Sequence, residues 1–192
     1  MSQYRTPPLE PVQISFDIES GSLSPTGPTL VRRAADLQGC FKNESSLAAL
    51  IANGNPEIYR VVSSVVPETS RELPQSITTI KPGSVAGELF MTKGHQHPDP
   101  QGEIYFGLAG EGGVIMFDGI NTSWVEVQVG KIAYIPPGWA HRSINTGTKD
   151  YKFLAVYPGS AGHDYQWVVK HGMGLRAYLE QGELKLKDFN LT

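Results

Sequence analysis

The stretch Thr92-Lys93-Gly94-His95-Gln96-His97 carries two histidines separated by one residue. In an extended strand, alternate side chains point to the same side, so His95 and His97 present two imidazoles on one face while Gln96 points away. Two convergent imidazoles are half of a metal site. The same pattern also occurs on solvated strands that bind nothing, so the rest of the site has to come from elsewhere in the chain.

Two further residues complete a four-ligand set. Glu103 follows a five-residue connection that contains two prolines and a glycine, and it begins the apolar run 104–108. Such a connection is typical of a loop between adjacent strands, so the carboxylate would return beside the two imidazoles. His141 stands after the double proline at 136–137, at the start of another β-prone run. A barrel would bring it to the same place.

The donor set of His95, His97, Glu103 and His141 suits a borderline divalent ion, because imidazole and carboxylate are the ligands that such ions accept together. Three of the five histidines in the chain belong to this pattern, which favours a metal site over purely structural histidines. We expect one divalent transition-metal ion per subunit. Iron(II) is the first choice, with manganese, nickel, cobalt or zinc as alternatives.

The composition is that of an ordinary globular domain, with 192 residues, 40% hydrophobic and 18% charged. A formal net charge of −3 and the absence of a basic run argue against nucleic-acid binding. The N-terminus lacks the apolar core of a signal peptide, and no apolar stretch has membrane-spanning length. We therefore expect a cytoplasmic protein without nucleic-acid or membrane partners. Its single cysteine, Cys40, cannot form an internal disulfide.

After Pro56 the chain becomes a series of short β-rich runs separated by turns that contain glycine or proline. Their spacing of roughly ten residues predicts an all-β sandwich or barrel. The residues 110–113 and 118–119 are hairpin signals. The predicted strands are 58–66, 76–80, 88–92, 103–109, 113–117, 124–129, 131–135, 142–145 and 152–157.

The flanking segments predict an arm, two helices and a hairpin. Residues 1–28 are rich in proline and predict an irregular N-terminal arm, followed by a single domain over 29–192 whose barrel core spans about 57–160. The residues 29–38 contain helix formers, with a glycine after them. A second helix has Asn43 or Ser45 as its cap and ends at 53–54. The tail 174–190 predicts a hairpin turning at 181–182, with a helix as the alternative.

A second group of polar side chains follows the last predicted strand. Tyr157, His163, Asp164 and Tyr165 lie within nine residues, with small residues at 159–162 between them. Small residues let a backbone pass close to a ligand, and phenols and an imidazole supply donors and acceptors for sugar hydroxyls. On composition alone, a surface loop with an aromatic anchor is the equal alternative.

Phosphate binding requires donors near the mouth of the barrel. Thr92, Lys93 and the Gly94 amide lie immediately before the histidine pair, and Thr78 with Thr79 occupies a neighbouring strand end. Arg142 follows His141 and so points to the opposite face of its strand, which favours a structural ion pair over contact with a substrate.

The histidine pair, Glu103 and His141 together resemble the two-part metal motif of the cupin superfamily. The wider stretches Thr92–His97, Ile135–Arg142 and Tyr157–Tyr165 are similar to the cupin-type glucose-6-phosphate isomerases of archaea and some bacteria. The likeness runs from about Leu30 to about Lys187. The spacer between His97 and Glu103 is one residue shorter than in the archaeal enzymes, a difference that a loop accommodates.

The resemblance implies an all-β cupin double-stranded β-helix, a jelly-roll barrel with short flanking helices. It also implies a metal-dependent isomerase that interconverts glucose 6-phosphate and fructose 6-phosphate, in glycolysis or gluconeogenesis, as a homodimer. By the same resemblance, one set of residues lies where these isomerases hold the phosphate and the sugar, and another lines the rest of the pocket. The first set is Tyr59, Thr78, Thr92, Gly94 and Tyr157, and the second is Tyr105, His163 and Tyr165.

An aldose–ketose isomerase moves hydrogen between two adjacent carbons and a proton between their oxygens. Glu103 is the candidate base for a route through an enediol, although the metal competes for the same oxygens. Direct passage of hydride is the second route, and the sequence leaves both open. In either, His163 or Tyr165 would handle the oxygen-bound proton or help to open the sugar ring.

Two other functions compete with this one. Many cupins with three histidines and one glutamate are iron-dependent dioxygenases, and the ligand set fits them equally well. The Tyr- and His-rich final segment and the phosphate candidates suit a sugar phosphate better than an apolar substrate. A non-catalytic sugar-binding cupin is the other alternative, which a measurement of turnover would distinguish.

Overall fold

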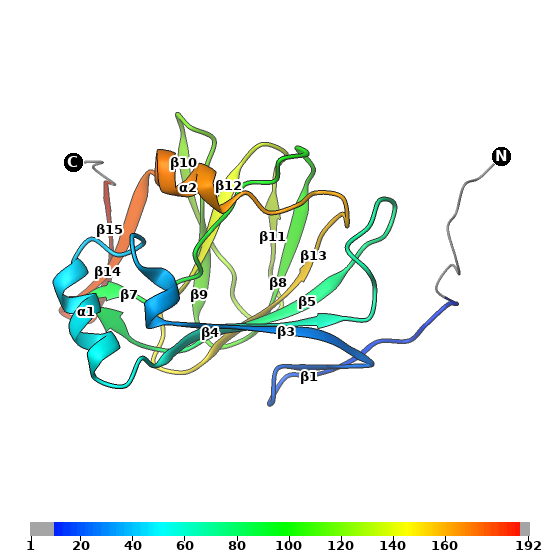
Figure 1. The fold of residues 1–192 in the computed structure, drawn as a ribbon, viewed down its shortest axis with the longest axis horizontal. Helices are drawn as coiled ribbons and strands as arrows, with labels where there is room; N and C mark the ends of the chain where they lie inside the picture. The colour runs from blue at the N-terminus through cyan, green and yellow to red at the C-terminus, as the bar shows by residue number, and fades with distance from the viewer. Residues whose placement is uncertain (1–9, 189–192) are drawn as a thin grey trace.

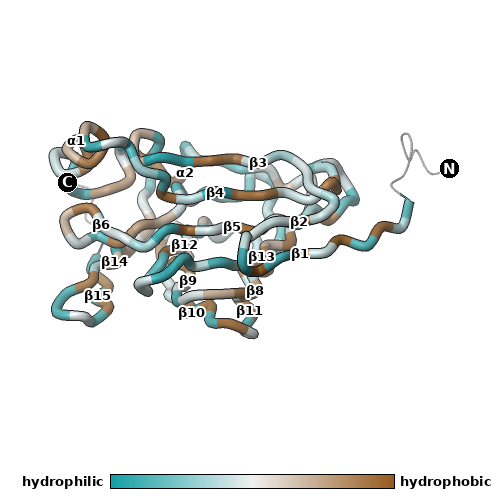
Figure 2. The backbone as a smooth tube through the Cα atoms, turned by 90° about the horizontal axis from the view of Figure 1, so that it is seen from below, coloured by the Kyte–Doolittle hydropathy of each residue, from teal (hydrophilic) through white to brown (hydrophobic). Residues whose placement is uncertain are grey.

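The computed structural model describes residues 10–188, which form four antiparallel sheets, two α-helices and one 3-10 helix. The largest sheet has the strand order β11-β8-β13-β5-β4-β3. Its strands are β3 (Thr26–Arg33), β4 (Glu57–Ser64), β5 (Gln75–Ile80), β8 (Glu103–Ala109), β11 (Ile132–Ile135) and β13 (Tyr151–Val156). Figure 2 shows these strands side by side in this order.

Three smaller sheets and the helices complete the fold, as Figure 1 shows. One sheet has the order β10-β9-β12, with β9 (Gly112–Phe117), β10 (Thr122–Glu126) and β12 (Ala140–Asn145). Another joins β6 (Ser84–Val85) and β7 (Glu88–Leu89) to β14 (Leu175–Glu180) and β15 (Glu183–Asp188). The last is the pair β1 (Ser15–Asp17) and β2 (Ser22–Ser24), and the helices are η1 (Ala34–Leu37), α1 (Glu44–Ala52) and α2 (Tyr165–His171).

The core lies between the inner faces of the sheets. Alternate residues of β13 and β11, such as Phe153 and Ile135, are buried there together with Ile115 of β9 and Ile144 of β12. Full burial of such a side chain contributes about 1.5–3 kcal/mol, so this alternation decides which face of each strand points inward. The predicted all-β fold with short flanking helices is confirmed.

Most predicted strands are present within a few residues of their expected ends, and β8 has the predicted bounds. The strand expected over 88–92 is wrong in its second half, because β7 ends at Leu89. From Met91 onward the backbone pairs instead with β12, through the bridge between Met91 and Ile144 and the hydrogen bond from Thr92 N–H to Ser143 O. The chain therefore crosses from one sheet to the other immediately before the histidines.

The helix predictions had mixed outcomes. The helix capped by Asn43 is confirmed as α1, where the Asn43 side chain accepts a hydrogen bond from Ser46 N–H. The helix expected over 29–38 is wrong: residues up to Arg33 belong to β3 and pair with β4, and only η1 follows. Pairing with a neighbouring strand outweighed the weak helix preference of this segment. The tail hairpin is confirmed as β14–β15, up to the last described residue.

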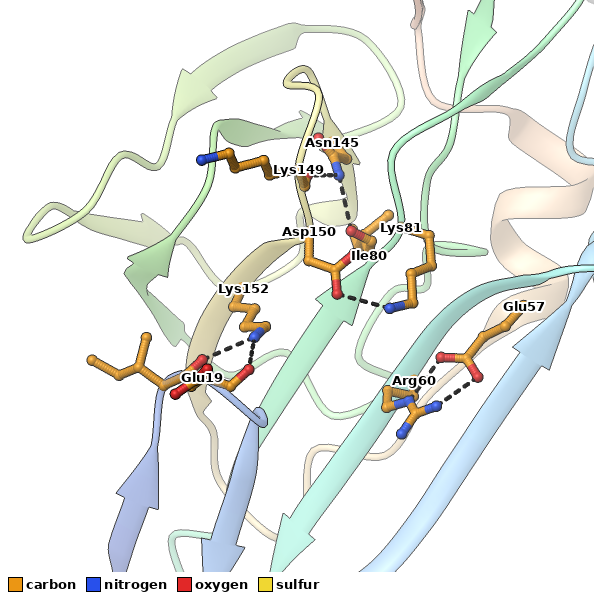
Figure 3. A network of polar contacts seen from close by, with 10 residues as sticks. Glu19, Glu57, Arg60, Ile80, Lys81, Asn145, Lys149, Asp150 and Lys152 are labelled. Atoms are coloured by element: carbon orange, nitrogen blue, oxygen red, sulfur yellow. Dashed lines mark hydrogen bonds and ion pairs between the residues drawn. The ribbon is translucent and has the colours of Figure 1, made fainter.

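The N-terminal segment packs on the outer face of the large sheet. Figure 3 shows Lys152 of β13 next to the β1–β2 turn, where its Nζ donates to the carbonyl oxygens of Ile18, at 2.9 Å, and Glu19. Leu23 of β2 joins a second apolar cluster with Ile77. The predicted arm over 1–28 thus includes the start of β3, and its residues 1–9 lie outside the described residues. A single domain over 29–192 remains a prediction.

In the described part of the chain, no helix has the length and apolar character needed to cross a membrane.

Candidate metal centre and active site

His95, His97, Glu103 and His141 lie together at one end of the barrel, with their ligand atoms all within 4.8 Å of one another. Glu103 is the first residue of β8, and His141 lies in β12. His95 pairs with His141 by two backbone hydrogen bonds, of 3.1 and 2.9 Å. This bridge holds the histidine pair against β12. Glu103 of the six-stranded sheet and His141 of the three-stranded sheet thus lie next to one another.

Two of the imidazoles are oriented by backbone carbonyls. His97 Nδ1 lies 2.8 Å from Gly162 O, and His141 Nδ1 lies 3.2 Å from Trp139 O. A carbonyl only accepts, so each Nδ1 carries a proton and each Nε2 faces the cluster. Both Nε2 atoms approach Glu103 Oε2, at 3.0 and 3.1 Å. Coordination of a metal through Nε2 requires this tautomer, with Nδ1 protonated and the Nε2 lone pair free.

The buried charges of the cluster are coupled. Burial would raise the pKa of Glu103, but the neighbouring His141 and His97 outweigh it and lower this pKa to about 2. Burial opposes protonation of His97, yet its hydrogen bond with Glu103 raises the pKa of His97 above the usual value. The carboxylate is therefore ionised and attracts positive charge, which a divalent ion supplies.

His95 supplies the clearest evidence that these residues fit a metal ion. Its Nε2 is buried and has no hydrogen-bond partner within the described part of the chain. Burial and the surrounding histidines hold its pKa well below the usual value, so the ring is neutral. A buried nitrogen lone pair without a partner costs free energy unless it binds something. The four residues thus fit a borderline divalent ion.

The cluster opens into a cavity of about 900 Å³. Its described wall contains hydroxyl, phenol and carboxylate groups but no lysine or arginine. Most of the residues predicted to bind substrate line this cavity together with His95 and Glu103. They are Tyr59, Thr78, Thr92, Tyr105, Tyr157, His163 and Tyr165.

Three other phosphate candidates lie outside the cavity wall. Gly94 packs behind the cluster, against the carbonyl of His141. Lys93 places its ammonium 5.9 Å from the centre of the Tyr165 ring. Thr79 faces the N-terminal segment, where its hydroxyl group lies beside Gly21.

His163 and Tyr165 stand beside the metal candidates. The ring centroid of His163 lies 4.4 Å from that of His95, and that of Tyr165 lies 5.9 Å from it. Burial lowers the pKa of His163, which keeps its imidazole neutral. Asp164 caps α2 by accepting from Trp167 N–H, and its backbone pairs with Gln96. The helix itself was not predicted from the sequence.

Several contributors to the site were missed by sequence reasoning. Glu68 reaches the cavity from the loop between β4 and β5, and Phe153 lines it from β13. The residues around Glu68 in the sequence give no indication of a site, because only the fold brings its loop next to Tyr157. Arg142 is buried, and among the described residues it donates through Nε and Nη2 to the Lys93 carbonyl in place of the expected ion pair.

The chain is similar to known proteins over most of its length. A family model described as glucose-6-phosphate isomerase (GPI) matches residues 31–190. Glucose-6-phosphate isomerase from Thermococcus kodakarensis is 38% identical over 181 residues, which cover 93% of this chain and 94% of the relative. The protein of the same name from Pyrococcus furiosus is 35% identical over 182 residues, with coverages of 93% and 95%.

Among solved structures, a deletion mutant of Bacillus subtilis oxalate decarboxylase aligns with a TM-score of 0.46 and 19% identity, covering 59% of this chain and 30% of that one. The match of the family model across most of the chain, together with relatives more than 30% identical along nearly their whole length, shows the family. This chain belongs to the glucose-6-phosphate isomerase family.

Proposed function

We propose that this protein interconverts glucose 6-phosphate and fructose 6-phosphate, with one divalent transition-metal ion held by His95, His97, Glu103 and His141. The observation that carries the proposal is the cluster of three histidines and one glutamate, of which His95 and Glu103 line a cavity that also carries hydroxyl and phenol groups. When bound, the ion supplies Lewis-acid polarisation of the substrate oxygens. Iron(II) is our first candidate, ahead of manganese, nickel, cobalt and zinc.

Glu103 is positioned to transfer the carbon-bound proton. Both close histidine contacts go to its Oε2, which leaves Oε1 for the substrate. The carboxylate is ionised, so its Oε1 has lone pairs that can accept a proton. Oε1 takes the proton from C2 of the aldose and returns it to C1, while the electron pair passes through the enediol. Loss of a C2 deuterium to solvent supports this route, whereas complete transfer of the label to C1 would assign a hydride shift.

His163 and Tyr165 serve the oxygen-bound proton. The neutral imidazole of His163 both donates and accepts, and it stands beside His95 at the cavity wall. The ring of Tyr165 stacks against that of His163 with an interplanar angle of 14°. His163 therefore moves the proton between the oxygens on C1 and C2, and Tyr165 holds its ring in place.

The phosphate binds through hydroxyl groups. The described cavity wall has no cationic side chain, so Tyr59, Thr78 and Thr92 supply the donors, with the Gly94 amide as a further candidate. We also propose a cytoplasmic location, on the grounds given from the sequence, and a homodimer with a place in glycolysis or gluconeogenesis, which rest on the family resemblance.

The test is turnover of fructose 6-phosphate by protein stripped with chelator and reloaded separately with each of the five ions. Activity restored by at least one ion supports the isomerase and the role of the metal. Inactivity with every ion, in protein shown to bind metal, would refute the proposed substrate. Oxygen consumption would then favour a dioxygenase, and sugar binding without turnover a sugar-binding module.

A further inference from the structure

The loop of residues 65–74, between β4 and β5, is a fixed part of the cavity wall. Gly159 N–H donates to the Glu72 carbonyl at 2.9 Å. A Cβ atom at position 159 would lie 2.4 Å from the carbonyl oxygen of Thr69, so only glycine permits this close approach. The loop therefore packs directly against the segment that follows β13.

Glu68 in this loop binds the hydroxyl of Tyr157. The Tyr157 hydroxyl donates to Glu68 Oε1 at 2.6 Å, and both residues line the cavity. Tyr157 is buried, whereas Glu68 is exposed at the rim. A phenol has one proton, and here it is donated to the carboxylate in the hydrogen bond. The Tyr157 oxygen therefore presents only lone pairs to a ligand, and the carboxylate beside it is also an acceptor.

Two other residues of the cavity wall, Thr92 and Tyr59, can donate hydrogen bonds to a ligand. Thr92 Oγ1 accepts from Ser143 N–H at 3.0 Å, so its hydroxyl proton remains available. Burial raises the pKa of Tyr59 to about 12, so the phenol stays protonated. Tyr59 lines the cavity together with Thr92, so its phenol is available to donate to a ligand there.

The two regions stand apart along the sheet. Tyr59 of β4 is level with Ile80 of β5, which is in turn level with Tyr151 of β13. Tyr157 lies six residues beyond Tyr151, just past the end of β13, so Tyr59 and Tyr157 enter the cavity at different levels of the sheet. Phosphate oxygens need donors and avoid a carboxylate, whereas sugar hydroxyls donate to acceptors.

We propose that Glu68 is a positioning residue: by accepting the hydrogen bond of the Tyr157 hydroxyl it makes this phenol an acceptor for a sugar hydroxyl, and it thereby orients a phosphorylated sugar with its phosphate toward Tyr59 and Thr92. The inference rests on the proposed function, because it concerns the same substrate in the same cavity.

A double-mutant cycle with metal-loaded protein tests the proposal. The variants are Glu68→Ala, Glu68→Gln, Tyr157→Phe and the combination of Glu68→Ala with Tyr157→Phe. Losing a charge-assisted hydrogen bond should raise the KM for fructose 6-phosphate about tenfold in Glu68→Ala. The amide oxygen introduced by Glu68→Gln can still accept, so this variant should recover part of the loss. In the Tyr157→Phe background, removing Glu68 should change KM by less than about twofold.

Two controls separate this role from general effects. Glu72→Gln removes a carboxylate of the same loop whose backbone carbonyl, not its side chain, holds Gly159, and it should leave KM unchanged. The inhibition constant of inorganic phosphate should change by less than about twofold in Glu68→Ala, because that ion binds at the donors Tyr59 and Thr92. Additive effects of the two substitutions, or phosphate inhibition strengthened as much as KM is raised, would overturn the proposal.

Failure of the proposed function is recognised separately, from wild-type turnover. If the wild type does not convert fructose 6-phosphate, the same cycle is measured as the Kd for sorbitol 6-phosphate by calorimetry. Non-additive losses there still support the role of Glu68. If the wild type binds neither compound, both the function and the orientation are refuted.

Discussion

At the scale of single residues, the candidate centre depends on how each imidazole is turned. The carbonyls of Gly162 and Trp139 hold the Nδ1 atoms of His97 and His141, and this leaves the Nε2 atoms directed at Glu103. Without an ion, the carboxylate draws positive charge onto His97, while the Nε2 atom of His95 has no partner among the described residues. A divalent ion would satisfy all four residues at once.

Replacing His141 by alanine should abolish metal retention and activity while the barrel stays folded. Loss of a residue that merely orients a ligand weakens metal binding about 10–100-fold, so loss of a ligand should cost more than about 100-fold. Metal content after gel filtration, circular dichroism and turnover measure these effects. His171→Ala is the matched control, because His171 bonds to Trp167 O within α2. A His141→Ala protein that keeps one ion per chain would contradict the ligand assignment.

At the scale of elements, Gln96 joins the segments that carry the site. Its backbone exchanges two hydrogen bonds with Asp164, which caps α2. Its side chain points away from the cluster and donates to Gly138 O at 2.7 Å, in the turn that precedes His141. The histidine pair, the turn before β12 and the segment of His163 are thus held together by one residue between two ligands.

Gln96→Ala should weaken metal binding about 10–100-fold although every ligand is present, because the turn that precedes His141 loses its hydrogen bond to the Gln96 side chain. Leaving the Gly138 carbonyl unpaired should also lower the free energy of unfolding by about 1–2 kcal/mol. Metal titration and chemical denaturation check the two effects. Gln128→Ala removes an exposed glutamine side chain whose amide donates to Glu126, and it should change neither. Equal metal affinity in the wild type and Gln96→Ala would rule out this supporting role.

At the scale of the whole molecule, the candidate metal centre is a group of buried polar side chains inside an otherwise apolar barrel core. His141 and Glu103 are 1% and 4% exposed, next to core side chains such as Tyr105. Burying charged and unpartnered groups opposes folding, and an ion that binds only the folded chain reverses this cost. Stability of the barrel and occupation of the site should therefore be linked.

Chelation should lower the midpoint of thermal unfolding, Tm, and reloading should restore it. An ion at about 100 times its Kd stabilises the folded state by about 2.7 kcal/mol. For a chain of this size, that corresponds to a shift in Tm of about 5–10 °C. Differential scanning calorimetry with and without iron(II) or manganese measures it. Magnesium, which prefers oxygen ligands, and the His141→Ala variant are the controls and should show no shift. An unchanged Tm on chelation of metal-loaded wild type would contradict the linkage.

Local patterns in the sequence determined much of this protein. Short β-rich runs separated by turns that contain glycine or proline predicted the β fold, because strand propensity and turn chemistry act within a few residues. The cap candidates Asn43 and Ser45 and the stop signal at 53–54 predicted α1, since capping acts within a few residues. The spacing of the histidine pair, Glu103 and His141 indicated a metal site, and the structure brings these four residues together.

Only the tertiary structure decided the features that depend on distant partners. Residues 29–33 became a strand because β4 lies beside them, and the path after Leu89 follows β12. Glu68 contacts Tyr157 across 89 positions of sequence, a pairing that no local pattern contains. A side chain's propensity and periodicity act over a few residues, whereas the choice of neighbour follows from how the whole chain buries its apolar surface.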